Sequence, residues 1–358
     1  MDNHAQELPE SKIEEVSGKP EKQAVVIFRS EIHQENGIID ASQLYRDIVS
    51  FISMQSEKFQ AENLGRTHPL QHILNSTSGG YISPSTMKSF DLCPAGYLVG
   101  KLFREKTGTA TSVGRTFHNI MESFYNGEVR TKVELDRITK ETVIKDEQFE
   151  REKDVLLHVE GYWDSDDYLG GPMNHRELQV ATEIFIKTNI RPLGVDVGVP
   201  MYLKMDRIDV RNIGLCVVDY KTGEGDPNPY LLGEHGYLPQ MIYYKWGAEA
   251  EYGETVKKVI LSCPGAYTKS LRNVEMDVHS LVQQSKVLEQ TMNHLEHIKK
   301  ARETKRFECS YMRYCGSCHI KWGCQTWLKS KGMDEKDVQK TIPIEIEVLD
   351  KVYTEEDG

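Results

Sequence analysis

An acid and a lysine, Asp219 and Lys221, stand two positions apart at the end of an apolar run, in the segment VVDYKTG at residues 217–223. Because side chains on a strand alternate between its faces, both would point the same way. Such a pair suits metal-assisted hydrolysis, in which the acid binds the metal and the lysine stabilises charge or orients and deprotonates the attacking water. The same pair also occurs as a surface ion pair beside a glycine turn, so alone it does not define a site.

Two more carboxylates precede this pair. Asp206 lies in the segment MDRID at residues 205–209, and a hairpin through residues 212–214 would bring it to Asp219 across two paired strands. Carboxylates that converge without a fixed positive partner require a divalent cation. Glu183 would add a third acid from the neighbouring strand, or else it is an exposed strand glutamate.

The ordered set of motifs resembles the PD-(D/E)XK nuclease superfamily over residues 81 to 326. It is most similar to the RecB-type branch, which includes the AddB subunits and the CRISPR-associated adaptation nucleases. The motifs that match are, in chain order, Gly-x-x-x-His at 114–118, Asp-Arg-Ile-Asp at 206–209, Asp-Tyr-Lys-Thr-Gly at 219–223 and Gln-x-x-x-Tyr at 240–244. The family often has a glycine just before its Asp-Arg pair, where Lys204 and Met205 stand here. That departure concerns local backbone packing and leaves the acid at Asp206 in place.

The resemblance implies a site for Mg²⁺ or Mn²⁺. Its implied ligands are three side chains and one backbone carbonyl: His118, Asp206, Asp219 and Tyr220. Lys221 would act on the nucleophilic water, and Glu183 would be an outer or bridging acid. Gln240 and Tyr244 would position the substrate strand or the lysine. Apart from the resemblance, Arg115 belongs to a local basic cluster that would bind the substrate, or else to a solvated helix face. Taken alone, a histidine on an amphipathic helix is more often a buried structural residue than a ligand.

The chain has seven cysteines, and four of them cluster between residues 309 and 324. The odd number and the polar N-terminus, which lacks a signal-peptide core, argue against a disulfide framework. Cys315, Cys318 and Cys324 are close enough in sequence for their thiolates to repel one another unless a metal neutralises them. Cys216 and Cys263 lie in or beside apolar strands and are expected to be core residues.

Both zinc and a cubane cluster require four ligands, so these three cysteines need a fourth. Cys309 would complete a local zinc site. RecB-like relatives that carry a cluster use one cysteine before the nuclease core and three after it, and the segment Phe-Asp-Leu-Cys-Pro at residues 90–94 matches that first position. The resemblance therefore implies a [4Fe–4S] cluster on Cys93, Cys315, Cys318 and Cys324, with zinc as the alternative. The cluster would tie the two ends of the core together, whereas a zinc site completed by Cys309 would be local.

Hydrophobic periodicity and turn residues predict the elements that must position these side chains. Expected helices cover residues 41–59, 83–98 with a bend at Pro94, 113–125, much of 128–169, 237–252 and 278–305. Expected strands cover residues 24–28, 179–187, 200–210, 214–221, 257–262 and 342–348. This order predicts an α/β fold around a mixed sheet. The resemblance implies that this sheet is central and flanked by helices, as in restriction endonucleases, and that a helical, cysteine-rich part stapled by the iron–sulfur cluster follows it.

The predicted organisation has three parts. Residues 1–80 form a partly disordered N-terminal extension, residues 81–330 the nuclease core with its cysteines, and residues 331–358 a strand and an acidic tail. The chain of 358 residues has a formal net charge of −11, which argues against a protein that merely coats nucleic acid. It has no apolar run of membrane-spanning length, so a cytoplasmic location is expected, or the host cytoplasm for a viral gene.

The residues and the resemblance together predict a metal-dependent DNA nuclease. The expected activity is that of an exonuclease on single-stranded or end-bearing DNA, in recombination, repair or phage DNA metabolism, with a helicase or recombination protein as partner. Two alternatives stay open. One is a non-catalytic DNA-binding or assembly subunit of a recombination or CRISPR-adaptation complex, and the other is a zinc-binding interaction protein whose acids are coincidental.

Overall fold

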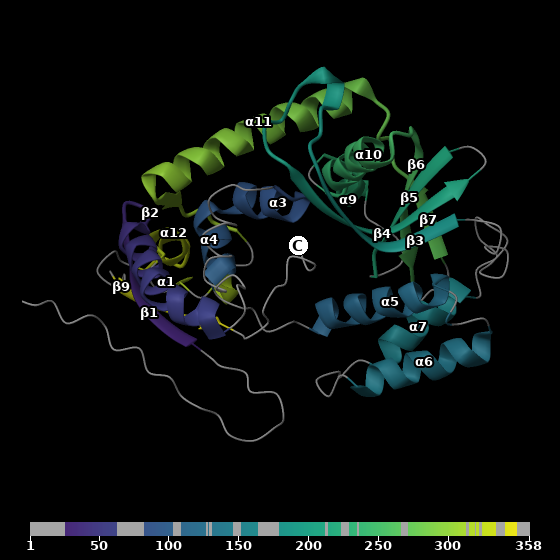
Figure 1. Cartoon of the computed structure of the whole chain (residues 1–358), viewed down its shortest axis with the longest axis horizontal. Helices are drawn as coiled ribbons and strands as arrows, with labels where there is room; N and C mark the ends of the chain where they lie inside the picture. Colours follow the sequence, from purple (N-terminus) through teal and green to yellow (C-terminus); the bar gives the residue numbers. More distant parts are fainter. Residues whose placement is uncertain are drawn as a thin grey trace, which may run out of the picture. The chain divides into compact units, whose positions relative to one another are not determined.

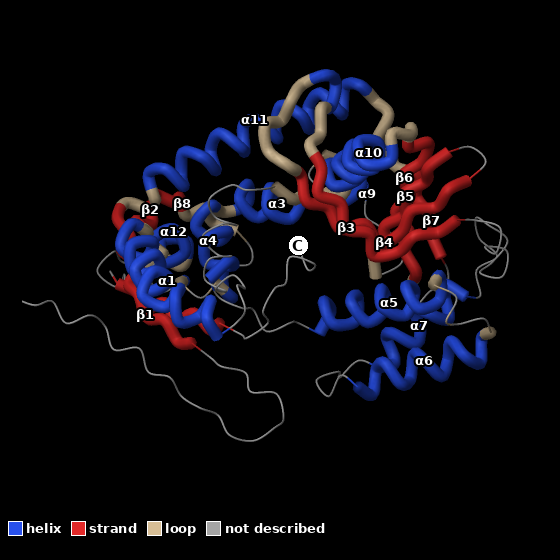
Figure 2. The backbone as a smooth tube through the Cα atoms, viewed as in Figure 1, coloured by secondary structure: helices blue, strands red, loops and turns tan. Residues whose placement is uncertain are grey.

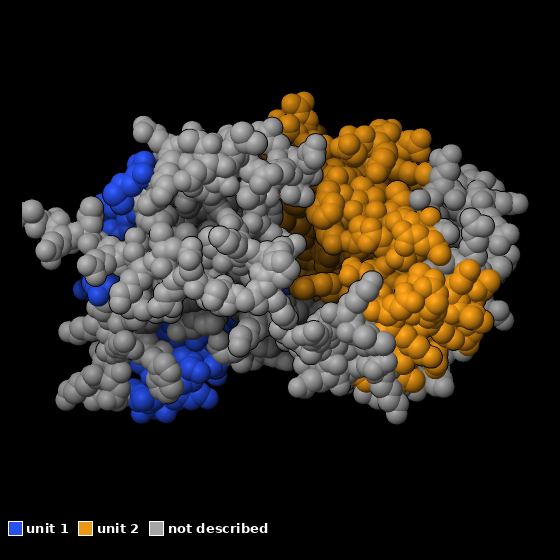
Figure 3. Space-filling view, turned by 60° about the horizontal axis from the view of Figure 1, so that its bottom comes forward, with its two compact units in different colours: residues 1–80, 85–105, 293–358 blue, residues 81–84, 106–292 orange. Residues whose placement is uncertain are grey.

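The structure is a computed structural model of the whole chain. It describes residues 26–62, 82–102, 109–126, 128, 131–145, 152–163, 179–211, 214–222, 229–234, 236–265, 271–312, 315–318, 320–321, 324–333 and 341–348. Three predicted features lie outside these residues: the disordered segment 1–24, the turn at residues 212–213 and the acidic tail after residue 348. The chain forms two compact units (Figure 3). Residues 81–84 with 106–292, orange and marked unit 2 in the figure, are termed the first unit, and residues 1–80 with 85–105 and 293–358, blue and marked unit 1, are termed the second unit.

The first unit is built on a five-stranded mixed sheet in the order β3-β4-β5-β6-β7 (Figures 1 and 2). The strands are β3 (Gln179–Thr188), β4 (Met201–Arg211), β5 (Gly214–Tyr220), β6 (Val256–Pro264) and β7 (Leu271–Glu275). Only β5 and β6 run parallel. A parallel pair requires a crossover connection, and α10 (Leu238–Tyr252) lies in it. The predicted helix–strand order of this region is confirmed, whereas β7 was not predicted.

Helices α5 (Thr109–Tyr125) and α7 (Glu152–Trp163) cover one face of this sheet, and α6 (Lys132–Lys145) packs against both of them (Figure 1). Their apolar stripes and the inward residues of β5 and β6 form one core, in which Phe117 and Cys216 are fully buried. Burying such a core stabilises the fold by roughly 1.5–3 kcal/mol per large apolar side chain. The short helix α9 (Pro229–Leu232) and the first half of α11 (Leu281–Thr304) complete the unit. The expected α/β fold with a mixed sheet flanked by helices is confirmed.

The second unit joins segments from both ends of the chain. Its sheet has the order β8-β2-β1-β9, with β1 (Val26–Glu35), β2 (Ile38–Asp40), β8 (Arg306–Glu308) and β9 (Thr341–Val348). Its helices are α1 (Ser42–Glu62), most of α3 (Pro84–Leu92), α4 (Pro94–Leu102), the second half of α11 and α12 (Gln325–Ser330). Cys93 lies at the predicted bend, between α3 and α4.

The hairpin between β1 and β2 has a two-residue turn, Asn36-Gly37. Both residues have positive φ, 52° and 74°, as a type I′ turn requires. Asparagine and glycine tolerate that left-handed conformation best, which is why this pair connects the strands. Among the described residues, no helix is long and apolar enough to cross a membrane.

Candidate active site

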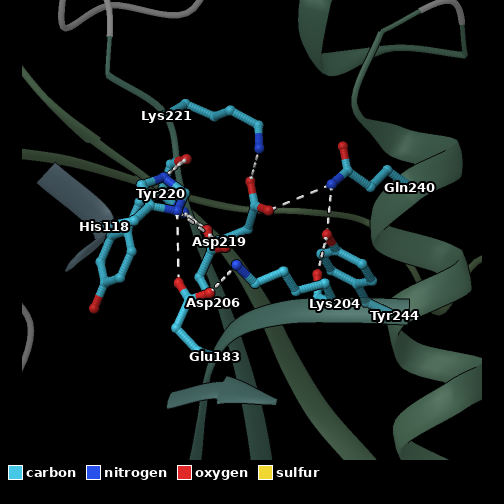
Figure 4. A network of polar contacts seen from close by, with 9 residues as sticks. All are labelled: His118, Glu183, Lys204, Asp206, Asp219, Tyr220, Lys221, Gln240 and Tyr244. Atoms are coloured by element: carbon cyan, nitrogen blue, oxygen red, sulfur yellow. Dashed lines mark hydrogen bonds and ion pairs between the residues drawn. The ribbon is translucent and has the colours of Figure 1, made fainter. Parts of the chain in front are cut away.

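The hairpin of β4 and β5 brings two predicted acids together. Arg207 pairs with Val218, and the same antiparallel register puts Asp206 beside Asp219. The Asp206 carboxylate accepts a hydrogen bond of 2.7 Å from the backbone N–H of Tyr220. Asp219 in turn forms an ion pair with Lys221, two residues along the chain (Figure 4). The predicted hairpin and the shared face of Asp219 and Lys221 are therefore observed.

Helix α5 delivers His118 to the same place. Its Nδ1 lies 3.3 Å from Asp206 Oδ1, and its Nε2 lies 3.3 Å from the carbonyl oxygen of Tyr220 (Figure 4). The glycine of the Gly-x-x-x-His motif allows this approach, because a Cβ on Gly114 would stand 3.1 Å from the Thr222 hydroxyl oxygen. A side chain there would require Thr222 or α5, which carries His118, to shift by a few tenths of an ångström.

Glu183 joins the group through an unusual backbone conformation. Its φ is +50°, which costs a residue other than glycine on the order of 1–3 kcal/mol, and the pairing of β3 with β4 is interrupted there. Its Oε1 lies 3.9 Å from His118 Nδ1, and its other oxygen forms an ion pair with Lys204. Of the two interpretations left open for Glu183, the structure favours the one that brings it to the site.

His118, Glu183 and Asp206 offer ligand atoms that all lie within 4.8 Å of one another. One imidazole nitrogen and two carboxylates suit a small divalent cation. The carbonyl oxygen of Tyr220 faces the same imidazole. Asp219 is outside this trio, because its oxygens contact Lys221 and Gln240. The three side chains and the Tyr220 carbonyl therefore fit the implied metal, and Asp219 lies next to this group, beside Asp206.

The charges within the site act strongly on one another. Burial and the neighbouring Asp206 raise the pKa of Asp219 to about 6, against the opposing effect of Lys221. The pKa of Asp206 is lowered: burial opposes its ionisation, but His118 and Lys221 outweigh burial. Burial disfavours the protonated His118, yet Asp206 and Asp219 raise its pKa. The pKa of Lys221 is raised because the two acids outweigh its burial, which favours the ammonium form.

Of the two predicted residues of α10, Gln240 contacts an acid of the site, and Tyr244 contacts Gln240 and the backbone of β4. Gln240 donates a hydrogen bond of 3.4 Å to Asp219 Oδ1 and one of 2.6 Å to the Tyr244 hydroxyl. Tyr244 donates to the backbone carbonyl of Lys204 at 2.8 Å. These bonds link α10, β5 and β4 around Asp219 (Figure 4). Arg115 is exposed on α5, three residues before His118.

A buried ion pair lies on the other face of the same strands. Arg207 and Asp209 are 3% and 0% exposed, and two contacts of 2.8 and 3.0 Å join them. Arg207 also donates to the hydroxyls of Tyr162 and Tyr220 at 3.0 and 2.9 Å. Arg207 follows Asp206, and Tyr220 separates Asp219 from Lys221. The Arg207 guanidinium therefore crosslinks β4 and β5 on the face opposite Asp206 and Asp219, and this fixes the distance between the two acids.

Five of the cysteines converge in the second unit. The Sγ of Cys93 accepts backbone N–H bonds from Gly96 at 3.2 Å and Ser310 at 3.4 Å, and the Sγ of Cys315 accepts one from Met312 at 3.2 Å. Cys93 and Cys324 lie close enough for their charges to act on the thiols of Cys315 and Cys318. Cys309 is the fifth member: it forms a hydrogen bond with Cys324 that helps to lower the pKa of Cys324 to about 6. Several thiols and N–H donors suit a thiolate-bound metal or cluster.

The sequence reasoning did not assign a role to three residues near the site. Lys204 is one, although its position two residues before Asp206 on a strand is a usable signal. Arg207 is the second. Tyr237 is the third: its ring lies 5.2 Å from the Lys221 ammonium, a cation–π distance. Cys216 and Cys263 are buried strand residues, as predicted.

A comparison with models of protein families identifies the family of this chain. A profile of the PD-(D/E)XK nuclease superfamily matches residues 81–325, more than half of the chain. The chain belongs to the PD-(D/E)XK nuclease superfamily. Membership indicates a metal-dependent nuclease with DNA as substrate. Among solved structures 26 chains match. One, described as "Crystal structure of SSO0001", has a TM-score of 0.31 and 11% identity, over 75% of this chain and 93% of that chain. No curated protein matched.

Proposed function

We propose that this PD-(D/E)XK protein is a DNA exonuclease that uses Mg²⁺ or Mn²⁺ on single-stranded or end-bearing DNA. The observation that carries the proposal is the convergence of His118, Glu183 and Asp206 beside the Asp219–Lys221 pair. These groups come from one helix and three strands, so their meeting is a property of the fold and not of one local motif. Surface ion pairs do not require such an arrangement.

Each group has a definite task in this proposal. His118, Glu183, Asp206, Asp219 and the Tyr220 carbonyl would hold the cation. When bound, a divalent cation polarises the scissile phosphate and makes water a better nucleophile. Lys221 is held as an ammonium, so it stabilises negative charge on the phosphate and orients the incoming water. Gln240 and Tyr244 hold Asp219 in place.

The test is hydrolysis of end-labelled DNA with Mg²⁺ or Mn²⁺, by the parent protein and by Asp219→Ala. We expect the variant to lose activity by at least about 100-fold, the scale of a lost electrostatic contact to the reacting group. Asp196→Ala is the matched control, since Asp196 is an exposed acid that pairs with Arg191. Equal cleavage by parent and Asp219→Ala would refute the assignment, and cleavage by neither would favour the non-catalytic subunit.

Linear and circular single-stranded DNA of one sequence separate exonuclease from endonuclease action. An exonuclease needs an end, so we expect linear DNA to be degraded while circular DNA persists. Cutting of both at similar rates would mean endonuclease activity and would overturn this part of the proposal.

We also propose a structural [4Fe–4S] cluster on Cys93, Cys315, Cys318 and Cys324. The backbone N–H donors around Cys93 support its choice over Cys309 as the fourth ligand. Iron and sulfide analysis with visible absorbance after anaerobic purification tests it. We expect Cys93→Ser to lose the cluster and Cys309→Ser to keep it. Colourless protein with stoichiometric zinc would overturn the iron assignment, and zinc lost in Cys309→Ser alone would identify the alternative site.

The proposal places the protein in the RecB/AddB-like branch, in the cytoplasm and in recombination, repair or phage DNA metabolism. A helicase or recombination protein would supply the DNA end. Affinity purification from the native host under nuclease-active conditions tests this partner, and we expect a DNA-dependent motor protein to be retained. Recovery of the protein alone would refute the partnership.

A further inference from the structure

Strands β3 and β4 carry matched rows of side chains that lead away from the metal ligands. Phe185 pairs with Lys204 and Lys187 pairs with Tyr202 in the antiparallel register, which places Glu183 opposite Asp206 one row earlier. Residues two apart on a strand share a face, and successive rows are about 7 Å apart. From the metal ligands outward, the cross-strand rows are therefore Glu183 opposite Asp206 (the acid row), Phe185 with Lys204 (the aromatic row), and Lys187 with Tyr202.

Side-chain contacts join the acid row and the aromatic row into one continuous surface. The Lys204 ammonium pairs with Glu183 and lies 5.4 Å from the centroid of the Phe185 ring. The Phe185 ring lies 6.0 Å from the Tyr202 ring. Glu183 in turn reaches His118 at 3.9 Å. The surface formed by Phe185, Tyr202 and Lys204 thus begins at the candidate metal ligands.

This surface is open to solvent. Phe185 is 59% exposed, more than any other aromatic side chain among the described residues, and the Lys204 side chain is 53% exposed. Strand β3 is also an edge strand of its sheet. An exposed phenylalanine contributes little to a core, and edge strands ordinarily carry polar residues on open positions. The ring is therefore better explained by a ligand than by packing.

The surface offers what a single nucleic-acid strand requires. An aromatic face stacks a base of any sequence, and a neighbouring ammonium attracts the phosphate. The chain as a whole has a formal net charge of −11, so a local pair of lysines has to supply the attraction that the protein as a whole lacks. Duplex DNA presents its bases only at groove edges, which a flat exposed ring cannot stack against.

We propose that Phe185, Tyr202 and Lys204 form a subsite for an unpaired stretch of the DNA substrate, next to the scissile phosphate. An unpaired base stacks on Phe185, its phosphate contacts Lys204, and Tyr202 with Lys187 continues the path along β3 and β4. This inference rests on the proposed nuclease function and narrows its substrate to a strand that is single-stranded where it leaves the metal site.

The test measures binding of a labelled single-stranded oligonucleotide by fluorescence anisotropy. All proteins compared carry Lys221→Met, here called the background, so that the oligonucleotide is not cleaved in the presence of Mg²⁺. Phe185→Leu keeps an apolar side chain but removes the ring, and we expect affinity to fall by about 5- to 150-fold, the range of one lost base stack. Tyr252→Leu is the matched control, since Tyr252 is an exposed aromatic on α10, and we expect no change.

Two further measurements separate stacking from a general loss of affinity. Lys204→Met should lower the slope of log affinity against log salt by about 0.7, as expected for one lost phosphate contact on a single strand, whereas Phe185→Leu should leave that slope unchanged. An oligonucleotide with one abasic position near its end should bind the background more weakly than the intact oligonucleotide does. In Phe185→Leu the two oligonucleotides should bind with equal affinity. Such coupling identifies the base that touches Phe185.

The outcomes distinguish this inference from the function on which it rests. If the parent protein cleaves DNA but Phe185→Leu binds as tightly as the background, the subsite is wrong and the nuclease assignment stands. If Phe185→Leu weakens binding while the parent cleaves nothing, the subsite stands and the nuclease assignment fails. A background that binds no oligonucleotide overturns the subsite as well.

Discussion

Protons and the divalent cation compete for the same ligand atoms, so binding of the cation should depend on pH. A carboxylate or imidazole must be unprotonated to hold a divalent cation. Asp206 stays ionised over the neutral range because its pKa is lowered, whereas Asp219 titrates near pH 6 and the pKa of His118 is raised. Lowering the pH from 7.5 to 5.5 should therefore weaken Mn²⁺ binding through Asp219 and His118, and not through Asp206.

The loss of Mn²⁺ affinity follows from the fraction of each side chain that is unprotonated at each pH. With a pKa of about 6, Asp219 is ionised to roughly 97% at pH 7.5 and roughly 24% at pH 5.5, a loss of about fourfold. For His118 even the ordinary value of 6.5 gives about tenfold, and a raised pKa gives more. Together they predict at least about 40-fold weaker binding, or about 2 kcal/mol.

Isothermal titration calorimetry of Mn²⁺ at pH 5.5 and 7.5, in buffers with different ionisation enthalpies, measures both the affinity and the protons released. Asp219→Asn should reduce the pH effect by about fourfold, because that side chain no longer titrates. An unchanged pH effect in Asp219→Asn would mean that Asp219 is not a ligand. Equal affinity of the parent protein at both pH values would refute the reasoning for both residues.

Three further predictions concern the scaffold of the site. Arg207→Met should lower the free energy of unfolding, measured in urea, by about 3–5 kcal/mol, because it leaves a buried charge on Asp209. Adding Asp209→Leu should restore most of that stability, and no recovery would contradict the role of the buried pair. Glu183→Gly should be more stable than Glu183→Ala by about 1 kcal/mol in the same assay, since glycine tolerates a positive φ; the reverse order would show that the strain is not real. Gly114→Ala should lower Mn²⁺ affinity in calorimetry although alanine favours a helix, and Thr222→Ala should rescue it; failure of the rescue would exclude the close approach as the cause.

Local patterns in the sequence were sufficient to predict most of the first unit. The β-branched run that ends in Asp219 reads as a strand, and the period of two placed Lys221 on the same face. The hairpin with Asp206 followed from turn residues between two such runs. The amphipathic stripe predicted α5, whereas the ligand role of His118 came from the family resemblance. Each of these signals acts over a few residues, which is why a single sequence contains it.

Features that depend on distant contacts could not be predicted in this way. The pairing of β1 with β9 joins opposite ends of the chain, and no local pattern specifies a partner about 300 residues away. The positive φ of Glu183 arises from its surroundings, because glutamate has no preference for that conformation. The Asn36-Gly37 turn is different: its two residues are a strong local hairpin signal that the sequence interpretation overlooked.

The central claim is that His118, Glu183, Asp206 and Asp219 together hold the divalent cation that hydrolysis requires. Anomalous diffraction from crystals soaked in Mn²⁺ tests it most directly, because it locates the ion independently of any activity. We predict one strong peak at about 2.0–2.3 Å from ligand atoms of His118, Asp206 and Asp219, with Glu183 bound directly or through water. A peak elsewhere, or none in protein that cleaves DNA with Mn²⁺, would contradict the account.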